Sequence, residues 1–400
     1  MSTNKKDDDV VIPSRVQIWK LASRPHTLTA SIVPVIVGYA LTIRLIRDNN
    51  PEVARSSSTP SFPYYYSTTS SLQRLSIQYA IFASFIQLST NLHNDYADYI
   101  KGADTAARVG QARATQRGWL TPHETCRGCA LCLGAALFVG AHYLIPIPHE
   151  CTISYDDAGG GGENDIDVGS SSAVAMDGNR YDPVMMVIVL TSTFNAVAYT
   201  GGPFPLGYVG LGRVSIGYAG LGDIFVFIYF GIVATIGVPY MYLTKISCLR
   251  VHSSSSSSSS SGRILWQLLR PSFLHSIPIG LLATAIIVVN NLRDRHTDVH
   301  AGKRTLAVRY GETFARAEYL LLLLGSYTFC IMSYFRGRQR DDMAWTALLP
   351  LVSFPMAIPQ LQAVAFGQKD GQALNDHVGG TARLQLVYCI LMATGLIISS

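Results

Sequence analysis

The sequence predicts an all-α polytopic membrane protein with nine transmembrane helices. Hydrophobic residues make up 48% of the 400 residues and charged residues only 14%, whereas a soluble domain carries about 25% charged residues. Such a chain has too little charge to solvate a globular surface of this size, so long apolar stretches must face lipid. Composition also excludes a disordered chain and a disulfide scaffold. The net charge of +5 does not indicate a nucleic-acid partner, and no obligate protein partner is evident.

Nine segments are apolar over the roughly 17–25 residues that a membrane helix needs. They are expected at 27–46, 76–92, 127–147, 183–199, 224–243, 273–292, 318–335, 343–366 and 384–399. Prolines occur inside several of them, which membrane helices tolerate when they pack against neighbours. Residues 1–22 are interpreted as a tail, and residues 23–400 as one membrane domain.

The distribution of positive charge predicts the orientation. With nine spans, the N-terminus and the loops after spans 2, 4, 6 and 8 share one side, and these segments hold most of the Lys and Arg residues. Because basic loops stay on the cytoplasmic side, we expect these segments in the cytoplasm or the organelle interior. The first residues do not resemble a secretory signal, and the run Asp7–Asp9 does not resemble a transit peptide.

Two low-complexity insertions, residues 148–182 and 252–262, are expected to be disordered or linker segments. The first contains a run of four glycines and eight acidic residues after position 149, and the second contains nine consecutive serines. Gly207–Gly212 is repeated ten residues later as Gly217–Gly222. No strand precedes these glycines, so they predict a turn and not a nucleotide-binding loop.

Two polar clusters stand at the ends of spans 2 and 6. The first is Asn91-Leu-His-Asn-Asp95-Tyr-Ala-Asp98, and the second is Asn290-Asn291-Leu-Arg-Asp294-Arg-His-Thr-Asp298. Helical spacing places Asn91, Asn94, Asp95 and Asp98 on one face of the first helix, and Asn290 or Asn291 with Asp294 and Asp298 on one face of the second. Both clusters lie at the same side of the membrane and continue into basic loops. This pattern favours Mg²⁺ bound by carboxylates together with substrate phosphates.

Other interpretations of these residues remain open. Each cluster alone could be a solvated loop, and an ion-coupled transporter also places Asp and Asn in membrane helices. Transporters place them near the membrane centre, however, whereas these clusters lie at helix ends. Cys126, Cys129 and Cys132 have metal-like spacing but lack a second pair of ligands, so buried thiols are the preferred interpretation.

At these residues the sequence resembles the UbiA superfamily of intramembrane prenyltransferases, and within it the 1,4-dihydroxy-2-naphthoate prenyltransferases of cyanobacterial or plastid type. The matching strings are SRPHTLTASIVPVIVG (23–38), NLHNDYADYIKGADT (91–105), VGQARATQRGWL (109–120), AYTGGPFPLGYVGLG (198–212) and NNLRDRHTDVHAGKRTLAVRYG (290–311). The resemblance implies an all-helical bundle of nine membrane spans. The duplicated glycine-rich unit departs from the single copy of the family.

The resemblance also implies roles for individual residues. The implied Mg²⁺ ligands are Asn91, Asp95, Asp98, Asn291, Asp294 and Asp298, and the four aspartates are the implied catalytic residues. The implied diphosphate-binding residues are Lys101, Arg113, Lys303 and Arg304. Asp104 matches an acid of the naphthoate branch, and Tyr199 is expected to form a site wall.

The reaction implied by the resemblance moves a phytyl or polyprenyl group from its diphosphate to 1,4-dihydroxy-2-naphthoate, with loss of CO₂, in phylloquinone or menaquinone synthesis. The partners implied are the isoprenoid diphosphate, the aromatic acceptor and the bilayer. The stretch 108–119 favours a phytyl donor. 4-Hydroxybenzoate and homogentisate are alternative acceptors, and a secondary transporter is the alternative of another class. A plastid membrane is expected for a eukaryotic chain, and a bacterial inner membrane otherwise.

Overall fold

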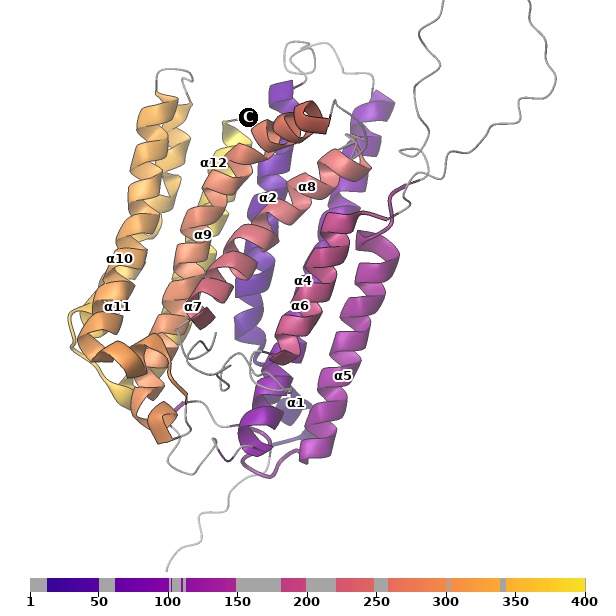
Figure 1. Ribbon diagram of the computed structural model, residues 1–400. Helices are drawn as coiled ribbons and strands as arrows, with labels where there is room; N and C mark the ends of the chain where they lie inside the picture. The colour runs from indigo at the N-terminus through magenta and orange to yellow at the C-terminus, as the bar shows by residue number, and fades with distance from the viewer. Residues whose placement is uncertain are drawn as a thin grey trace, which may run out of the picture.

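The computed structural model is an all-α bundle in every regular element that it describes. It describes residues 13–49, 62–100, 102, 109–110, 113–148, 181–198, 221–247, 258–300, 303–338 and 343–399. The helices run side by side, with α1 at one end of the bundle and the C-terminus at the other (Figure 1). We call these the α1 end and the C-terminal end.

The described elements follow one another in nine passes between the two ends. A short amphipathic helix, α1 (Arg15–Ser23), and a single turn, η1 (Pro25–Thr27), precede the first pass. The passes are α2 (Leu28–Asn49), α4 (Phe62–Ile100), α5 (Pro122–Val139) with η2 (Gly140–Leu144), α6 (Pro183–Ala198), α7 (Leu221–Val226) with η4 (Phe227–Val233) and α8 (Ala234–Lys245), α9 (Ser258–His300), α10 (Leu306–Gly337), η5 (Ala344–Ser353) with α11 (Phe354–Gln360) and η6 (Leu361–Ala365), and η7 (Gly371–Leu374) with α12 (Asn375–Ile398). Each expected membrane segment coincides with one pass.

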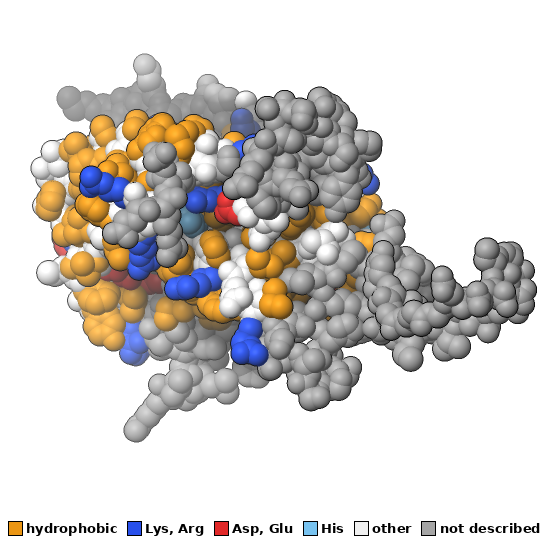
Figure 2. All heavy atoms as spheres, turned by 90° about the horizontal axis from the view of Figure 1, so that it is seen from above, with side chains coloured by type: hydrophobic (Ala, Val, Ile, Leu, Met, Phe, Trp, Pro, Cys, Tyr) orange, Lys and Arg blue, Asp and Glu red, His pale blue; other side chains and the backbone are white. Residues whose placement is uncertain are grey.

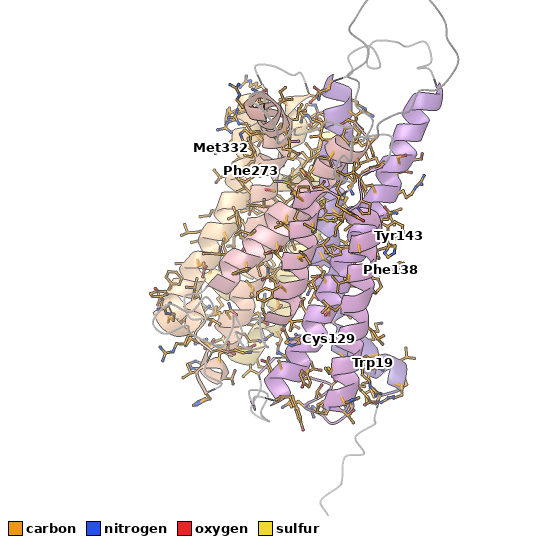
Figure 3. The ribbon with its side chains drawn as sticks, turned by 45° about the vertical axis from the view of Figure 1, so that its right-hand side comes forward. Trp19, Cys129, Phe138, Tyr143, Phe273 and Met332 are labelled. Atoms are coloured by element: carbon orange, nitrogen blue, oxygen red, sulfur yellow. The ribbon has the colours of Figure 1, made fainter. Side chains whose placement is uncertain are left out.

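Seven of the passes are long and apolar enough, by length and composition, to cross a membrane. The other two are helical but do not meet both criteria: α6 has only 16 residues, and the 39-residue α4 is less apolar because polar residues occur along it. The expectation of nine equally clear spans is therefore confirmed only in part. Large apolar side chains such as Phe138 and Tyr143 point outward (Figure 3), as helices facing lipid require.

The limits of both insertions need correction. Asp182 is not part of a disordered loop: it is 2% exposed, and its side chain accepts hydrogen bonds from the backbone N–H groups of Val184 and Met185 at 3.0 and 3.1 Å, which caps α6. The last four serines of the serine tract, Ser258–Ser261, belong to the first turn of α9. Apart from residues 148, 181 and 262, the rest of both insertions lies outside the described residues, as does most of the repeated glycine-rich unit.

Apolar side chains fill two main cores. One lies among α2, α9, α10 and α12, around Leu282 and Tyr388, and the other among α2, α4, α6 and α8, around Tyr79 and Met241. A smaller cluster at the α1 end packs Ile18 and Trp19 of α1 against the loop after α4 and against Cys129 of α5 (Figure 3). Cys129 is a buried free thiol. The C-terminal end presents Lys and Arg side chains among hydrophobic ones (Figure 2).

Helices η4 and α9 approach closely where two glycines face each other. A Cβ atom added to Gly231 would lie 2.5 Å from the Cα of Gly280, whereas one added to Gly262 would meet nothing within 4 Å. We expect Gly231→Ala to lower the free energy of unfolding by about 1–3 kcal/mol, because the backbones must separate. Thermal unfolding in detergent, with Gly262→Ala as the matched control, measures this. Equal stability of the two variants would contradict the close packing.

The alternation of the passes also predicts topology. Helix α9 runs from the C-terminal end, where Ser258 lies, to the α1 end, where α10 begins and bends at Gly311 with a positive φ of 83°. A reporter in the serine tract and a reporter after Gly311 should therefore label opposite faces of the membrane. Labelling of both on one face would mean that α9 does not cross.

Candidate active site

The first acidic motif is buried at the end of α4. Asp95 and Asp98 are each 1% exposed, and their spacing of three residues places both on one helix face. The loop that follows α4 covers them. In that loop, Arg113 donates from Nη2 to Asp98 Oδ2 at 2.8 Å, and Thr115 donates from its backbone N and its Oγ1 to Asp95 Oδ2 at 3.4 and 3.2 Å.

Lys303 joins this motif to the second one. Its Nζ lies 3.2 Å from Asp98 Oδ2 and 3.9 Å from Asp298 Oδ1. Lys303 follows the end of α9, and its backbone N–H bonds the carbonyl of Asp298 at 2.9 Å. The structure thus brings together acids from two motifs that are about 200 positions apart, and it places the predicted cation Lys303 between Asp98 and Asp298.

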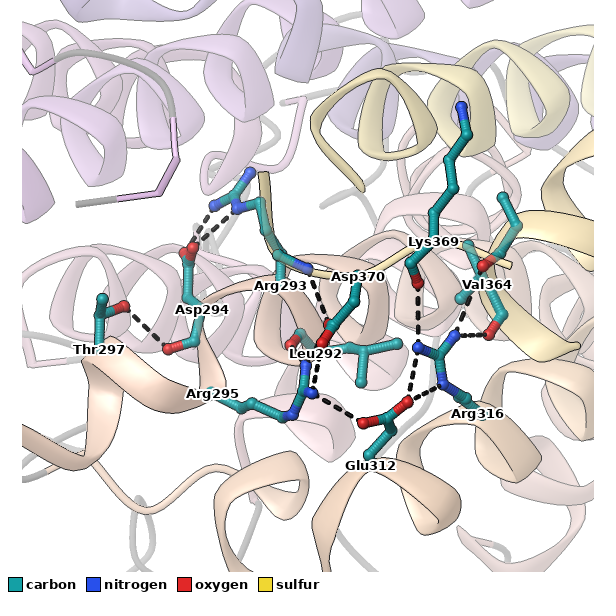
Figure 4. A network of polar contacts seen from close by, with 12 residues as sticks. Leu292, Arg293, Asp294, Arg295, Thr297, Glu312, Arg316, Val364, Lys369 and Asp370 are labelled. Carbon is teal, nitrogen blue, oxygen red and sulfur yellow. Dashed lines mark hydrogen bonds and ion pairs between the residues drawn. The ribbon is translucent and has the colours of Figure 1, made fainter. Parts of the chain in front are cut away.

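Asp294 is held by its chain neighbour. Arg293 donates from Nε and Nη2 to the two carboxylate oxygens of Asp294, at 2.7 and 2.5 Å (Figure 4). The same guanidinium donates to Asn290 Oδ1 at 2.7 Å and to Asn375 Oδ1 at 2.9 Å. Asn375 in turn donates to the backbone carbonyl of Val109 at 3.0 Å. Asn375, the first residue of α12, therefore ties the second motif to the loop after α4.

The two amides implied as metal ligands have protein partners. Asn91 donates to the Ser23 carbonyl at 2.9 Å and to Thr27 Oγ1 at 2.8 Å, and its Oδ1 accepts from Gln87 at 3.1 Å. These contacts tie α4 to the start of the first pass. Asn291 donates instead to Asp223 of α7, at 3.3 Å.

A second polar network braces the end of α9. Arg295 pairs with Asp370 through two hydrogen bonds and with Glu312 at 2.7 Å, and Arg316 bonds Glu312 and the carbonyls of Val364 and Lys369 (Figure 4). The Arg295 guanidinium lowers the pKa of Asp370 to about 2. A lowered acid pKa preserves this pair above about pH 4, and the pair is lost only as the pH falls toward 2. Near neutral pH the network fixes the helix segment that carries Asp294 and Asp298.

The remaining predicted site residues are not all placed. Lys101, Asp104 and Tyr199 lie outside the described residues. Arg304 is exposed next to Lys303. The structure therefore brings Asp95, Asp98, Asp298, Arg113 and Lys303 into one cluster and leaves Asp294 beside it on Arg293.

The cluster has the donor chemistry that Mg²⁺ prefers, which is carboxylate oxygen. Asp95 Oδ1 is buried and accepts no hydrogen bond from any described residue, and Arg113 Nε lies 3.9 Å from it. Among the described residues, no three acidic, His or Cys side chains surround a common point. Arg113 and Lys303 lie beside the carboxylates instead. The residues present fit a metal that binds together with an anion, if the anion replaces the carboxylates as the partner of Arg113 and Lys303.

Sequence reasoning missed four residues that shape this site. Thr115 and Arg293 lie within the matching strings, and a carboxylate beside an arginine is a visible signal for pairing. Asp223 and Asn375 are far from the motifs in the chain. Only packing of α7 and α12 against α9 brings them close, so the sequence carried no local signal for them.

Fold and site together define a helical, multi-pass membrane protein with a buried acidic centre at one end. Residues 172–369 match the UbiA prenyltransferase family. The chain is similar to 1,4-dihydroxy-2-naphthoate octaprenyltransferases from Escherichia coli K12, with 27% identity, 96% of this chain and 97% of the relative covered, and from Haemophilus influenzae, with 25% identity and 97% and 98% covered. A UbiA homolog from Archaeoglobus fulgidus, solved with DMAPP and Mg²⁺, aligns over 94% of this chain and 99% of that chain at 13% identity, with a TM-score of 0.43.

The matched family and the relatives that align along nearly the whole chain are all prenyltransferases. The chain is an integral multi-pass membrane protein, and its residues 172–369 match the UbiA prenyltransferase family.

Proposed function

We propose that this chain transfers a prenyl group from an isoprenoid diphosphate to 1,4-dihydroxy-2-naphthoate, with loss of CO₂, in menaquinone or phylloquinone synthesis. The observation that carries the proposal is the position of the Lys303 ammonium between Asp98 and Asp298. It joins two acidic motifs at a point where a bound diphosphate would meet both. The acceptor is proposed from the two 1,4-dihydroxy-2-naphthoate octaprenyltransferases, which are similar to the chain along nearly all of its length.

Mg²⁺ is the proposed cofactor: Asp95, Asp98, Asp294 and Asp298 would hold it, and it would neutralise charge on the diphosphate. The remaining positive charge comes from the chain. Arg113 is 5% exposed and Lys303 is about 20% exposed, so both act with little screening by water. We propose that both exchange their carboxylate partners for diphosphate oxygens when the donor binds.

The chemical step then follows from charge stabilisation. The allylic C–O bond breaks, and its electron pair leaves with the diphosphate, where Arg113 and Lys303 stabilise the developing charge. The electron-rich ring carbon that bears the carboxylate attacks the allylic carbon and forms the new C–C bond. The carboxylate leaves as CO₂, and its bonding electrons restore the aromatic ring. The prenyl tail is proposed to lie along lipid-facing helix surfaces.

An acceptor and donor panel tests this proposal. The purified chain in vesicles is incubated with Mg²⁺, with phytyl or octaprenyl diphosphate, and with one of three acceptors: 1,4-dihydroxy-2-naphthoate, 4-hydroxybenzoate or homogentisate. We expect a prenylated product with the naphthoate only, and the preferred donor defines the chain length. A product formed with another acceptor alone would overturn the naphthoate assignment and preserve the prenyltransferase.

A further inference from the structure

Asp223 is a buried acid next to the second motif. It lies near the start of α7, is 5% exposed, and accepts a hydrogen bond from Asn291 Nδ2 at its Oδ1, at 3.3 Å. Its backbone carbonyl accepts a second, longer bond from Thr284 Oγ1 of α9, at 3.5 Å. Burying an acid is costly unless the acid has a task or a partner. A carboxylate at this buried position therefore needs an explanation.

The contact fixes the direction of the Asn291 amide. An asparagine side chain has an oxygen on one side and an NH₂ group on the other. When the NH₂ group donates to Asp223, the oxygen must point to the opposite side. No described residue donates a hydrogen bond to that oxygen, whereas the oxygen of the preceding residue, Asn290, is taken by Arg293 at 2.7 Å.

Direction matters because Mg²⁺ binds amide oxygen and not amide nitrogen. A flipped Asn291 would present two N–H donors to a cation and would repel it. A carboxylate that accepts from the NH₂ group prevents this flip, as partners of metal ligands do in other metal sites.

We propose that Asp223 is a positioning residue that holds Asn291 with its Oδ1 toward the diphosphate and metal site. The inference rests on the proposed function, and it adds the amide oxygen of Asn291 to the four aspartates that are proposed to hold Mg²⁺. Asp223 acts through Asn291 and does not itself touch the substrate. The competing explanation is that Asp223 only packs α7 against α9.

Mg²⁺ titrations separate the two explanations. Asp223→Leu removes the acceptor, and Asp223→Asn keeps the shape but permits either amide direction. We expect both variants to raise the Mg²⁺ concentration for half-maximal transfer about 10–100-fold, with kcat at saturating Mg²⁺ changed much less. Thr284→Val, which removes the other bond to Asp223 and keeps the carboxylate, is the matched control and should titrate as wild type.

A second readout does not depend on turnover. Mg²⁺ with inorganic pyrophosphate should raise the unfolding temperature of the wild type and of Thr284→Val, and the rise should require a higher Mg²⁺ concentration in Asp223→Asn. In an Asn291→Ala background, Asp223→Asn should add nothing to the shift in Mg²⁺ dependence, because a residue that acts through Asn291 has nothing left to orient.

The possible outcomes are distinct. An active wild type with unchanged Mg²⁺ dependence in both Asp223 variants would overturn this inference alone, as would additive effects in the Asn291→Ala background. A wild type without Mg²⁺-dependent transfer to any acceptor would instead overturn the proposed function. If Asp223→Leu fails to fold, Asp223→Asn carries the test.

Discussion

Asp298→Asn is expected to reduce prenyl transfer about 10²–10³-fold and to leave the unfolding temperature unchanged. Asp298 contributes least to the packing of the site among the four motif acids. Its side chain is 13% exposed and stands 3.9 Å from Lys303, whereas Asp95 and Asp98 are 1% exposed. The substitution removes a charge that would hold Mg²⁺ and keeps the side-chain shape. Initial rates in vesicles and thermal unfolding in detergent measure the two effects.

His296→Gln is the matched control, since His296 is exposed on the same turn of α9. It should be as active as wild type. Full activity in Asp298→Asn would remove the second motif from the metal site.

Asp98→Ala is a poorer test, because it would leave Arg113 and Lys303 without the carboxylate that both contact. Loss of one partner from a buried pair costs about 3–5 kcal/mol, so inactivity could then follow from unfolding.

Lys303→Met is expected to lower kcat by one to two powers of ten and to raise KM for the prenyl donor by less. A charge-assisted hydrogen bond contributes about 1.5–3 kcal/mol, and this bond strengthens as the leaving diphosphate gains charge. KM for the naphthoate should stay nearly constant, because that substrate approaches the other side of the allylic carbon. Steady-state kinetics at saturating Mg²⁺, with each substrate varied in turn, give these constants.

Two variants control for charge alone. Lys303→Arg keeps the cation and should retain more activity than Lys303→Met. Lys369→Met removes an exposed cation at the same end of the bundle (Figure 4) and should be normal. Wild-type kinetics in Lys303→Met would show that the ammonium only pairs with Asp98 and Asp298 and takes no part in transfer.

Hydropathy located every pass that the structure describes, because burial in lipid imposes a single strong requirement on about twenty consecutive residues, although only seven of these passes meet that requirement in full. It could not find element ends that depend on side chains. Asp182 begins α6 through its capping bonds, and a tract of serines carries no apolar pattern that would have revealed the first turn of α9.

The acids of the site were predictable from their spacing, and so was the basic residue between them. Helical periodicity places Asp95 and Asp98 on one face, and Lys303 follows Asp298 by five residues. The partners that come from other helices were not predictable. Asn291 donates to Asp223, and Arg293 to Asn375, only because α7 and α12 pack against α9, which no local pattern encodes.

Diphosphate release is the most direct test of the central claim. Purified protein in vesicles is given a prenyl diphosphate, and released diphosphate and CO₂ are measured with and without Mg²⁺ and 1,4-dihydroxy-2-naphthoate. The proposed function predicts release only when both are present, with one CO₂ for each diphosphate. Absence of release under all four conditions, or release that ignores both Mg²⁺ and the acceptor, would contradict it.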